Sequence, residues 1–286
     1  MARGLDHVVH VVRDLDAAGV FYGRLGFTVG ARNRHPWGTH NRIVQFPNCF
    51  LEILTVAETE KIRPHTDMAF SFGGFNRDFL AKRGEGLSML AAESDDPAAD
   101  KAVFDGAGFG GSELFEFSRK GQRPDGSETE VGFRIAFARD PASPNAGFFT
   151  MTQTRPENFW TPELQRHANG VRGLTGCVLV AENPTDHHIF LQTFVGVRDV
   201  QATSRGITIP TERGTILVLD PRAFEDTFGR APPKDEGLRL AALSFAVAGL
   251  GEAALMLERN EIRHRDHRGK LFVDPVDAFG ALLAFE

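Results

Sequence analysis

Two side chains in the first fifth of the chain have the types that bind a divalent metal or move a proton. His7 lies in the β-branched run of residues 5–12, and Glu52 interrupts the apolar run of residues 50–54. Both runs have the composition of β-strands. An imidazole and a carboxylate on neighbouring strands can bind a divalent metal (Zn, Mn, Ni, Fe or Mg). We therefore take His7 and Glu52 as candidate metal ligands and catalytic residues.

Strand alternation predicts which faces these side chains share. His7 should point the same way as Val9, and Asp6 and His10 should point to the opposite face. A carboxylate among apolar neighbours is costly to bury unless a cation, a metal or a hydrogen bond offsets its charge. The alternatives are an ion pair between Glu52 and Arg42, and a structural role for His7.

A polar stretch between these two runs supplies candidate substrate-binding residues. His40, Asn41 and Arg42 follow Gly38-Thr39, and Trp37 lies beside them in a loop that also holds His35. Arg42 could bind a substrate carboxylate or phosphate through its two-pronged guanidinium group. An ion pair within the protein is the alternative for Arg42, and His35 and Trp37 are expected to flank the entrance.

Composition excludes several classes of protein. The chain has 286 residues, 42% hydrophobic residues and a net charge of −6, with Lys and Arg scattered along it, so we expect no nucleic-acid partner. The longest mostly apolar run, residues 240–251, is too short to cross a bilayer. Cys49 and Cys177 lie in apolar runs and are expected to be free thiols of a cytoplasmic protein. The 25 phenylalanines and single tyrosine indicate a thick apolar core and favour an apolar pocket.

A repeated unit provides the elements that would position these residues. A Gly-Leu pair followed by an apolar strand occurs four times, at residues 4, 86, 173 and 237. Each strand is followed by a predicted helix and three further strand-like segments, which gives an α+β fold of four βαβββ units. The units should pair into two domains, residues 1–160 and 171–286. An insertion at residues 57–85 is either a lid over a pocket or a packed connection.

Four paired βαβββ units resemble the vicinal oxygen chelate superfamily of glyoxalases, extradiol dioxygenases and bleomycin-resistance proteins. The motifs that carry the resemblance to its glyoxalase-like members are Asp6-His7-Val8-Val9, Gly38-Thr39-His40-Asn41-Arg42, Leu51-Glu52-Ile53, and Arg155-Pro156-Glu157-Asn158-Phe159-Trp160 with Gln165, His167, Asn169 and Gly170. The resemblance implies two open, U-shaped sheets, with a metal inside a sheet held by the first and fourth strands of each unit.

The resemblance also implies roles for particular residues. His7 and Glu52 would be the metal ligands of the first unit, and Gln153 a third ligand from the second unit, where Met89 and Met151 take the matching positions. His167, in the segment between the domains, would reach the substrate. In the second pair of units, Gly176 and Leu240 stand at the first-strand ligand positions, which implies a degenerate partner domain without metal.

These expectations lead to two hypotheses about function. The first is a metal-dependent enzyme of lyase or isomerase type that acts on a small carbonyl or oxygen-rich substrate. The missing second histidine argues against an extradiol dioxygenase, whose iron is held by two His and one carboxylate. The second is a metal-free protein of resistance type that binds a small molecule in an apolar pocket. A homodimer is a further expectation.

Overall fold

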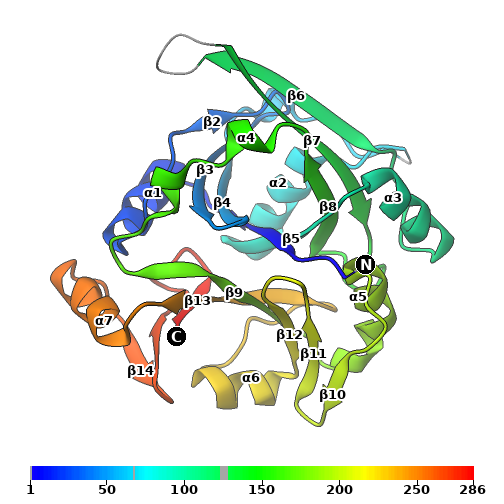
Figure 1. The fold of residues 1–286 in the computed structure, drawn as a ribbon. Coiled ribbons are helices and arrows are strands. Elements are labelled where there is room, and N and C mark those ends of the chain that lie inside the picture. The colour runs from blue at the N-terminus through cyan, green and yellow to red at the C-terminus, as the bar shows by residue number, and fades with distance from the viewer. Residues whose placement is uncertain (1, 67, 123–127) are drawn as a thin grey trace.

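The computed structural model describes residues 2–66, 68–122 and 128–286, which form two curled, eight-stranded mixed sheets (Figure 1). The first sheet has the strand order β2-β3-β4-β1-β5-β8-β7-β6, and the second repeats this order as β10-β11-β12-β9-β13-β16-β15-β14. In each sheet the two central strands are antiparallel to one another, and each pairs in parallel with the last strand of its own unit. The predicted α+β fold of two open-sheet modules is confirmed.

All four predicted βαβββ units are present in the described chain. The first sheet is built from β1 (Leu5–Val11), α1 (Leu15–Arg24), β2 (Asn33–Arg34), β3 (Thr39–Phe46), β4 (Cys49–Val56), β5 (Gly86–Glu93), α3 (Pro97–Gly106), β6 (Phe115–Gln122), β7 (Glu128–Ala138) and β8 (Gly147–Gln153). The second sheet is built from β9 (Val171–Val180), η3 (Pro184–His187), α5 (His188–Val195), β10 (Gln201–Thr203), β11 (Gly206–Pro210), β12 (Thr215–Leu219), β13 (Arg239–Val247), α7 (Leu250–Arg259), β14 (Arg265–His267), β15 (Lys270–Val273) and β16 (Leu282–Phe285).

Five further short elements lie between or inside these units: η1 (Thr59–Lys61), α2 (Phe72–Arg83), α4 (Pro156–Phe159), η2 (Pro162–Gln165) and α6 (Pro221–Phe228). Helix starts follow from their capping residues. Asp14 and Asp96 accept hydrogen bonds from backbone N–H groups in the first turns of α1 and α3, and Asp220 does the same for α6. The sequence thus determines locally where these helices begin.

The observed strands differ from the expected ones beside the first helix. The composition of residues 27–31 predicts a strand after the first helix, but the strand here is β2 at Asn33–Arg34. Phe27 instead packs its ring against Phe46 and Phe245 in the core. The composition of residues 121–127 predicts a turn, of which residues 123–127 lie outside the described part of the chain.

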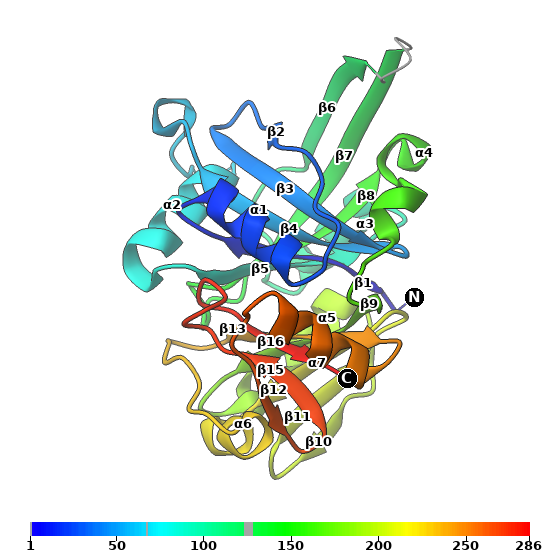
Figure 2. The same ribbon diagram turned by 90° about the vertical axis from the view of Figure 1, so that its left-hand side faces the viewer.

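One continuous apolar core joins the two modules, which lie one above the other in Figure 2. It contains side chains from the outer face of the first sheet, such as Val8 and Leu90, together with Leu179 and Leu243 of the second sheet. Helices α1 and α5 contribute to the same core. The hairpin of β6 and β7 projects beyond this body (Figure 2).

The inner faces of the two sheets are filled differently. In the second sheet, α6 packs Phe224 and Phe228 into a buried cluster with Val178, Ala242 and Phe272. In the first sheet, α2 covers one end of the inner face through Phe79 and Leu80, and the remaining space is a cavity. None of the described helices is long and apolar enough to cross a membrane.

Candidate active site

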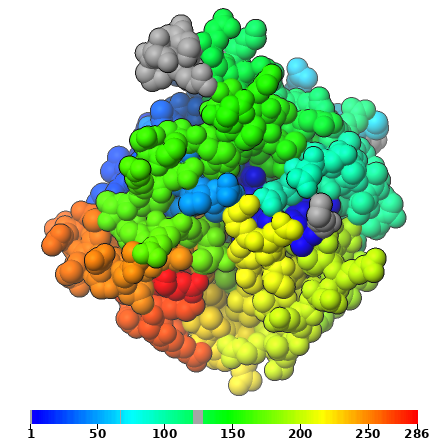
Figure 3. Space-filling view, viewed as in Figure 1, coloured from blue at the N-terminus to red at the C-terminus, as the bar shows by residue number. Residues whose placement is uncertain are grey.

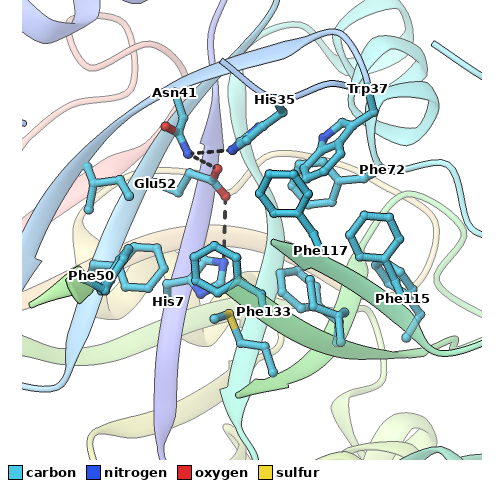
Figure 4. Close-up of a pocket in the computed structure, with 16 residues that line it drawn as sticks. His7, His35, Trp37, Asn41, Phe50, Glu52, Phe72, Phe115, Phe117 and Phe133 are labelled. Carbon is cyan, nitrogen blue, oxygen red and sulfur yellow. Dashed lines mark hydrogen bonds and ion pairs between the residues drawn. The ribbon is translucent and has the colours of Figure 1, made fainter. Parts of the chain in front are cut away.

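The cavity of the first sheet is narrow, with a volume of about 70 Å³. It lies among the inner faces of β3, β4, β1, β8, β7 and β6, and Phe72 of α2 forms part of its wall (Figure 4). The face of the molecule seen in Figure 1 is hollowed near its centre, where blue N-terminal atoms lie beneath the green and yellow surface (Figure 3). The lining side chains are His7, His35, Trp37, Asn41, Ile43, Phe50, Glu52, Phe72, Phe115, Phe117, Phe133, Ile135, Phe137, Phe149, Met151 and Phe159.

The polar lining side chains gather at one end of this cavity. The Nε2 atom of His7 on β1 lies 3.8 Å from Oε2 of Glu52 on β4. The amide nitrogen of Asn41 on β3 donates to Oε1 of Glu52 over 2.5 Å. These three residues come from adjacent strands, because β1 pairs with β4 and β4 pairs with β3. The order of strands in the sheet therefore brings them together (Figure 4).

Asp6 holds the other side of the His7 ring. Its Oδ1 atom lies 2.5 Å from His7 Nδ1, and both side chains are buried. Alternation along the strand placed Asp6 on the opposite face, and the structure corrects this expectation. Leu5 pairs with Ala92 and His7 with Ala91, so Asp6 is an extra residue in β1, a bulge that redirects its side chain. His7 thus has Nδ1 engaged by a carboxylate and Nε2 directed at Glu52.

Burial raises the pKa of the Glu52 carboxyl, and the nearby His7 and the hydrogen bond from Asn41 act in the opposite direction. Glu52 is only 6% exposed. No Lys or Arg forms an ion pair with Glu52 in the described part of the chain. The expected alternative of an ion pair with Arg42 is therefore not formed. A metal ion or a proton can supply the charge that offsets this carboxylate.

His35 extends the polar end, although its sequence position indicated only the cavity entrance. Its Nδ1 lies 2.9 Å from Thr39 Oγ1, and its Nε2 lies 3.3 Å from the amide nitrogen of Asn41. Burial lowers the pKa of His35 to about 3, so the ring is neutral and its Nε2 accepts from Asn41. The hydrogen bonds run from Thr39 through His35 and Asn41 to Glu52.

A tight turn positions His35 and Trp37 over the cavity. Gly38 has a φ of 86°, and a Cβ atom there would lie 2.3 Å from the carbonyl oxygen of Glu58. Only glycine fits this backbone position without strain. Trp37 then stacks on His35 and meets the edges of Phe115 and Phe117, which belong to the opposite edge strand β6. The two edges of the curled sheet therefore approach each other across the mouth.

Three of the predicted substrate-binding residues lie outside the cavity. His40 and Arg42 alternate with Asn41 on β3 and point to the other face, where His40 contacts Glu58 and Arg42 contacts Asp16. His167 lies between the modules, where its ring packs against Phe27 and Phe46. Its two nitrogens bind the backbone at Thr28 and Gln45. Asn41 and Trp37 are the predicted substrate-binding residues that do line the cavity.

Gln153, the candidate third ligand, is the last residue of β8. It lies two residues beyond Met151, which lines the cavity, and it pairs across the sheet with Phe133, another lining residue. Gln153 itself does not line the cavity. Its Oε1 atom is buried and has no hydrogen-bond partner within the described structure. The expected role of Gln153 as a ligand stays a prediction.

Comparison with known proteins places this chain in a family. The family model described as a glyoxalase-like domain matches residues 5–195, which include both sides of the cavity. The chain belongs to this glyoxalase-like family. A comparison with curated proteins finds no match.

Solved structures share the fold of this glyoxalase-like chain at low sequence identity. A hypothetical protein from Staphylococcus aureus is 12% identical with a TM-score of 0.67, and the match covers 99% of each chain. A mutant of 4-hydroxymandelate synthase from Streptomyces coelicolor is 12% identical with a TM-score of 0.60, over 99% of this chain and 92% of that one. A Mn(II)-bound glyoxalase from Novosphingobium aromaticivorans is 12% identical with a TM-score of 0.57, over 100% and 82%.

The donor set of the glyoxalase-like site fits a divalent metal with two protein ligands at its centre. His7 Nε2 and Glu52 Oε2 face each other, and the hydrogen bond from His7 Nδ1 to a carboxylate is the usual support of a metal-binding histidine. Within residues 2–66, 68–122 and 128–286, no three His, Cys, Asp or Glu side chains are arranged to hold a metal. Any further protein ligand must therefore be of another type, such as the amide of Gln153.

Proposed function

We propose that this chain is a metal-dependent enzyme of lyase or isomerase type that acts on a small oxygen-rich or carbonyl substrate. The observation that carries the proposal is the pairing of His7 Nε2 with Glu52 Oε2, 3.8 Å apart, at one end of the cavity in the first sheet. The Mn(II)-bound glyoxalase among the structural neighbours is an example of this fold with a divalent metal.

The residues at the polar end of the cavity would have different roles. His7 and Glu52 would hold the metal, with Gln153 as the third protein ligand, and a bound metal would stabilise a negatively charged substrate oxygen as a Lewis acid. Asp6 fixes the His7 ring so that Nε2 presents its lone pair to the cavity. Asn41 keeps the Glu52 carboxylate in place by its hydrogen bond to Oε1.

Glu52 is also the residue best placed to move a proton. Its carboxylate lines the cavity beside His7 Nε2, where a substrate at the polar end would lie. Its Oε2 atom would take a proton from the carbon or hydroxyl beside the substrate carbonyl and return it to a neighbouring atom. The apolar walls would exclude water from this exchange.

The two modules would have different roles. We assign the site to a domain of residues 1–160 and a supporting role to a partner domain of residues 171–286. Phe224 and Phe228 of α6 pack on part of the inner face of the second sheet. The hollow beside them is lined by Gly176, Leu217 and Ser244 and differs in its side chains from the cavity of the first sheet. The partner domain would then stabilise the first by burying its outer face.

A metal-free binding protein is the second candidate. It is favoured by the many apolar side chains of the cavity and by the presence of only one imidazole and one carboxylate where a metal would bind. In that case His7 and Glu52 would share a proton and hydrogen-bond to a ligand oxygen. No cofactor would then be needed.

Metal analysis of the purified protein separates the two candidates. The protein would be stripped with a chelator, reloaded separately with Mg, Mn, Fe, Co, Ni and Zn, and compared with Glu52→Gln. We expect one metal ion per wild-type chain and loss of the metal in the variant, with an unchanged circular dichroism spectrum. Asp16→Asn, which removes an exposed carboxylate outside the cavity, is the matched control. Full metal occupancy in Glu52→Gln would refute the assignment, and a wild-type protein that binds no metal would favour the second candidate.

A further inference from the structure

The polar side chains that line the cavity gather at one end of it. His7, His35, Asn41 and Glu52 form one end, and the other lining side chains are apolar or aromatic, eight of them phenylalanines. Figure 4 shows Glu52 and Asn41 at one side and Phe72, Phe115 and Phe117 at the other. A ligand that matches this lining has one polar head and a hydrocarbon body.

No Lys or Arg lines the cavity in the part of the chain that the structure describes. Arg42, the residue expected to bind a carboxylate or phosphate, forms its ion pair with Asp16 on the opposite face of β3. The charged lining residue is Glu52, and His35 is neutral because burial lowers its pKa to about 3. A carboxylate or phosphate on the substrate would therefore lose its hydration without meeting a protein cation.

One cation lies near the mouth and has to be considered. Arg119 on β6 donates to Oδ1 of Asn33 over 3.1 Å, and its charge contributes to the low pKa of His35. It does not line the cavity. Its hydrogen bond to Asn33 joins the two edges of the sheet, which gives it a structural role.

The apolar walls are suited to a flat ring. Phe50 stacks on His7 with ring centroids 4.2 Å apart and an angle of 13° between the ring planes, whereas Phe149 meets His7 edge-on. Trp37 meets Phe115 and Phe117 edge-on as well. Aromatic rings prefer such stacked and edge-to-face neighbours. The indole N–H of Trp37 is buried and lacks a partner in the described structure, so it can donate to a ligand oxygen.

We propose that the substrate is a compact, uncharged aryl compound whose single polar head carries neighbouring hydroxyl or carbonyl oxygens. The head would lie against His7 and Glu52, and the ring would lie among Phe117, Phe133 and Phe149. This inference rests on the proposed function for its chemistry, since it names the substrate class of the same site. It excludes sugar phosphates, nucleotide thioesters and peptide conjugates, whose charged groups would find no partner in the cavity.

Calorimetric titration of the purified protein with three probes tests this inference. The probes are 2-hydroxyacetophenone, hydroxyacetone, which has the same head without the ring, and mandelate, which has the ring with a carboxylate. We expect 2-hydroxyacetophenone to bind at least about tenfold more tightly than hydroxyacetone, because burial of the ring is favourable. In the chelator-treated protein, where no metal ion can face its carboxylate, mandelate should be weaker by a similar factor. Equal binding of hydroxyacetone, or equal or tighter binding of mandelate in the chelator-treated protein, would overturn the inference.

Three variants test whether the cavity causes this preference. Phe133→Ala should weaken 2-hydroxyacetophenone by about fivefold or more and leave hydroxyacetone unchanged, since it removes only ring contacts. Phe117→Leu at the more exposed edge strand tests the same contact if Phe133→Ala does not fold. Arg119→Gln should change none of the three affinities, and a loss of mandelate binding in this variant would show that Arg119 recruits anions.

Failure of the proposed ligand class can be distinguished from failure of the proposed function. Binding is measured without turnover, both in the metal-loaded protein and after treatment with a chelator. If the protein holds no metal but keeps the preference for 2-hydroxyacetophenone, the enzyme proposal fails and the ligand class stands. If the metal is bound at His7 and Glu52 but hydroxyacetone binds as tightly as 2-hydroxyacetophenone, only the ligand class fails.

Discussion

Asp6 and His7 are neighbours in the chain, yet their side chains meet, with Asp6 Oδ1 2.5 Å from His7 Nδ1. A regular strand would send them to opposite faces. The bulge at Asp6 removes this alternation for one residue, so a single strand delivers both the imidazole and the group that orients it. His7 is therefore oriented by a residue of its own strand, without help from another element. This makes Asp6 the first residue to test.

Replacement of Asp6 by asparagine should weaken metal binding while His7 and Glu52 remain in place. Loss of the carboxylate behind a metal-binding histidine typically lowers metal affinity by about 10–100-fold. A competition titration against a chromogenic chelator would measure this change. Asp16→Asn on the exposed helix α1 should retain the wild-type affinity. Unchanged affinity in Asp6→Asn would show that His7 does not bind a metal through Nε2.

Asn41 and Arg42 should respond differently to substitution, although they are adjacent on β3. Asn41→Leu leaves the buried Glu52 Oε1 without its donor, and we expect a loss of about 1–3 kcal/mol in the free energy of unfolding. Arg42→Gln removes a solvent-exposed ion pair and should have a smaller effect. Urea denaturation of both variants measures the difference. A larger loss for Arg42→Gln would contradict the assigned positions of the two side chains.

Stability should fall in mild acid, partly because of His10. This ring is fully buried, receives a hydrogen bond from Tyr22 and bonds to the carbonyl oxygen of Phe279. Burial lowers the pKa of His10 from 6.5 to about 4. The unfolded chain therefore takes up a proton below about pH 6.5 that the folded chain refuses until about pH 4. The contribution of neutral His10 to the free energy of unfolding is on the order of 3 kcal/mol. It is complete above pH 6.5 and is lost as the pH falls from 6.5 to 4.

Chemical denaturation at several pH values between 7.5 and 4.5 would check this prediction. His10→Gln should show a shallower fall in unfolding free energy than the wild type, whatever its stability at pH 7.5. In that variant, His35 still contributes to the fall in the free energy of unfolding, because its own pKa is lowered to about 3. Identical slopes in the two proteins would exclude His10 as a contributor.

The packing of α6 gives a prediction about the second module. Phe228 is 4% exposed and contacts Phe224 and Phe272. Phe228→Ala should lower the free energy of unfolding by about 3–5 kcal/mol, the usual range for a buried phenylalanine. Metal content and probe affinity of the folded variant should remain at wild-type values. A loss of either in the folded protein would mean that the second module acts on the site directly.

The fold could be predicted because its signals are local and repeated. Each unit begins with Gly-Leu and an apolar strand, and Asp14 and Asp96 mark helix starts by their capping side chains. The cavity position of Asn41 could also have been found, since alternation on β3 separates it from His40 and Arg42. Helix α6 had a signal as well, because Asp220-Pro221 is a helix start.

Other features depend on contacts between distant parts of the chain and leave no local pattern. The bulge at Asp6 is visible only in the pairing of β1 with β5. The position of His35 depends on the pairing of β2 with β3 and on the turn at Gly38. His167 was assigned to the substrate through a motif, but its ring fills a gap between the modules instead.

Helix α6 packs on the second sheet, and the first sheet contains the cavity. This difference affects how many substitutions each module can tolerate. Most substitutions lower stability by about 1 kcal/mol, and a protein loses function when such losses exceed its reserve. The core is continuous across the modules, so the well-packed half around Phe224 and Phe228 supports the half that contains the cavity. Changes to the cavity wall, at Phe117 or Phe133 for example, can therefore accumulate without unfolding the chain. Under the proposed function, the second module would maintain the shape while the ligand preference of the first is free to change.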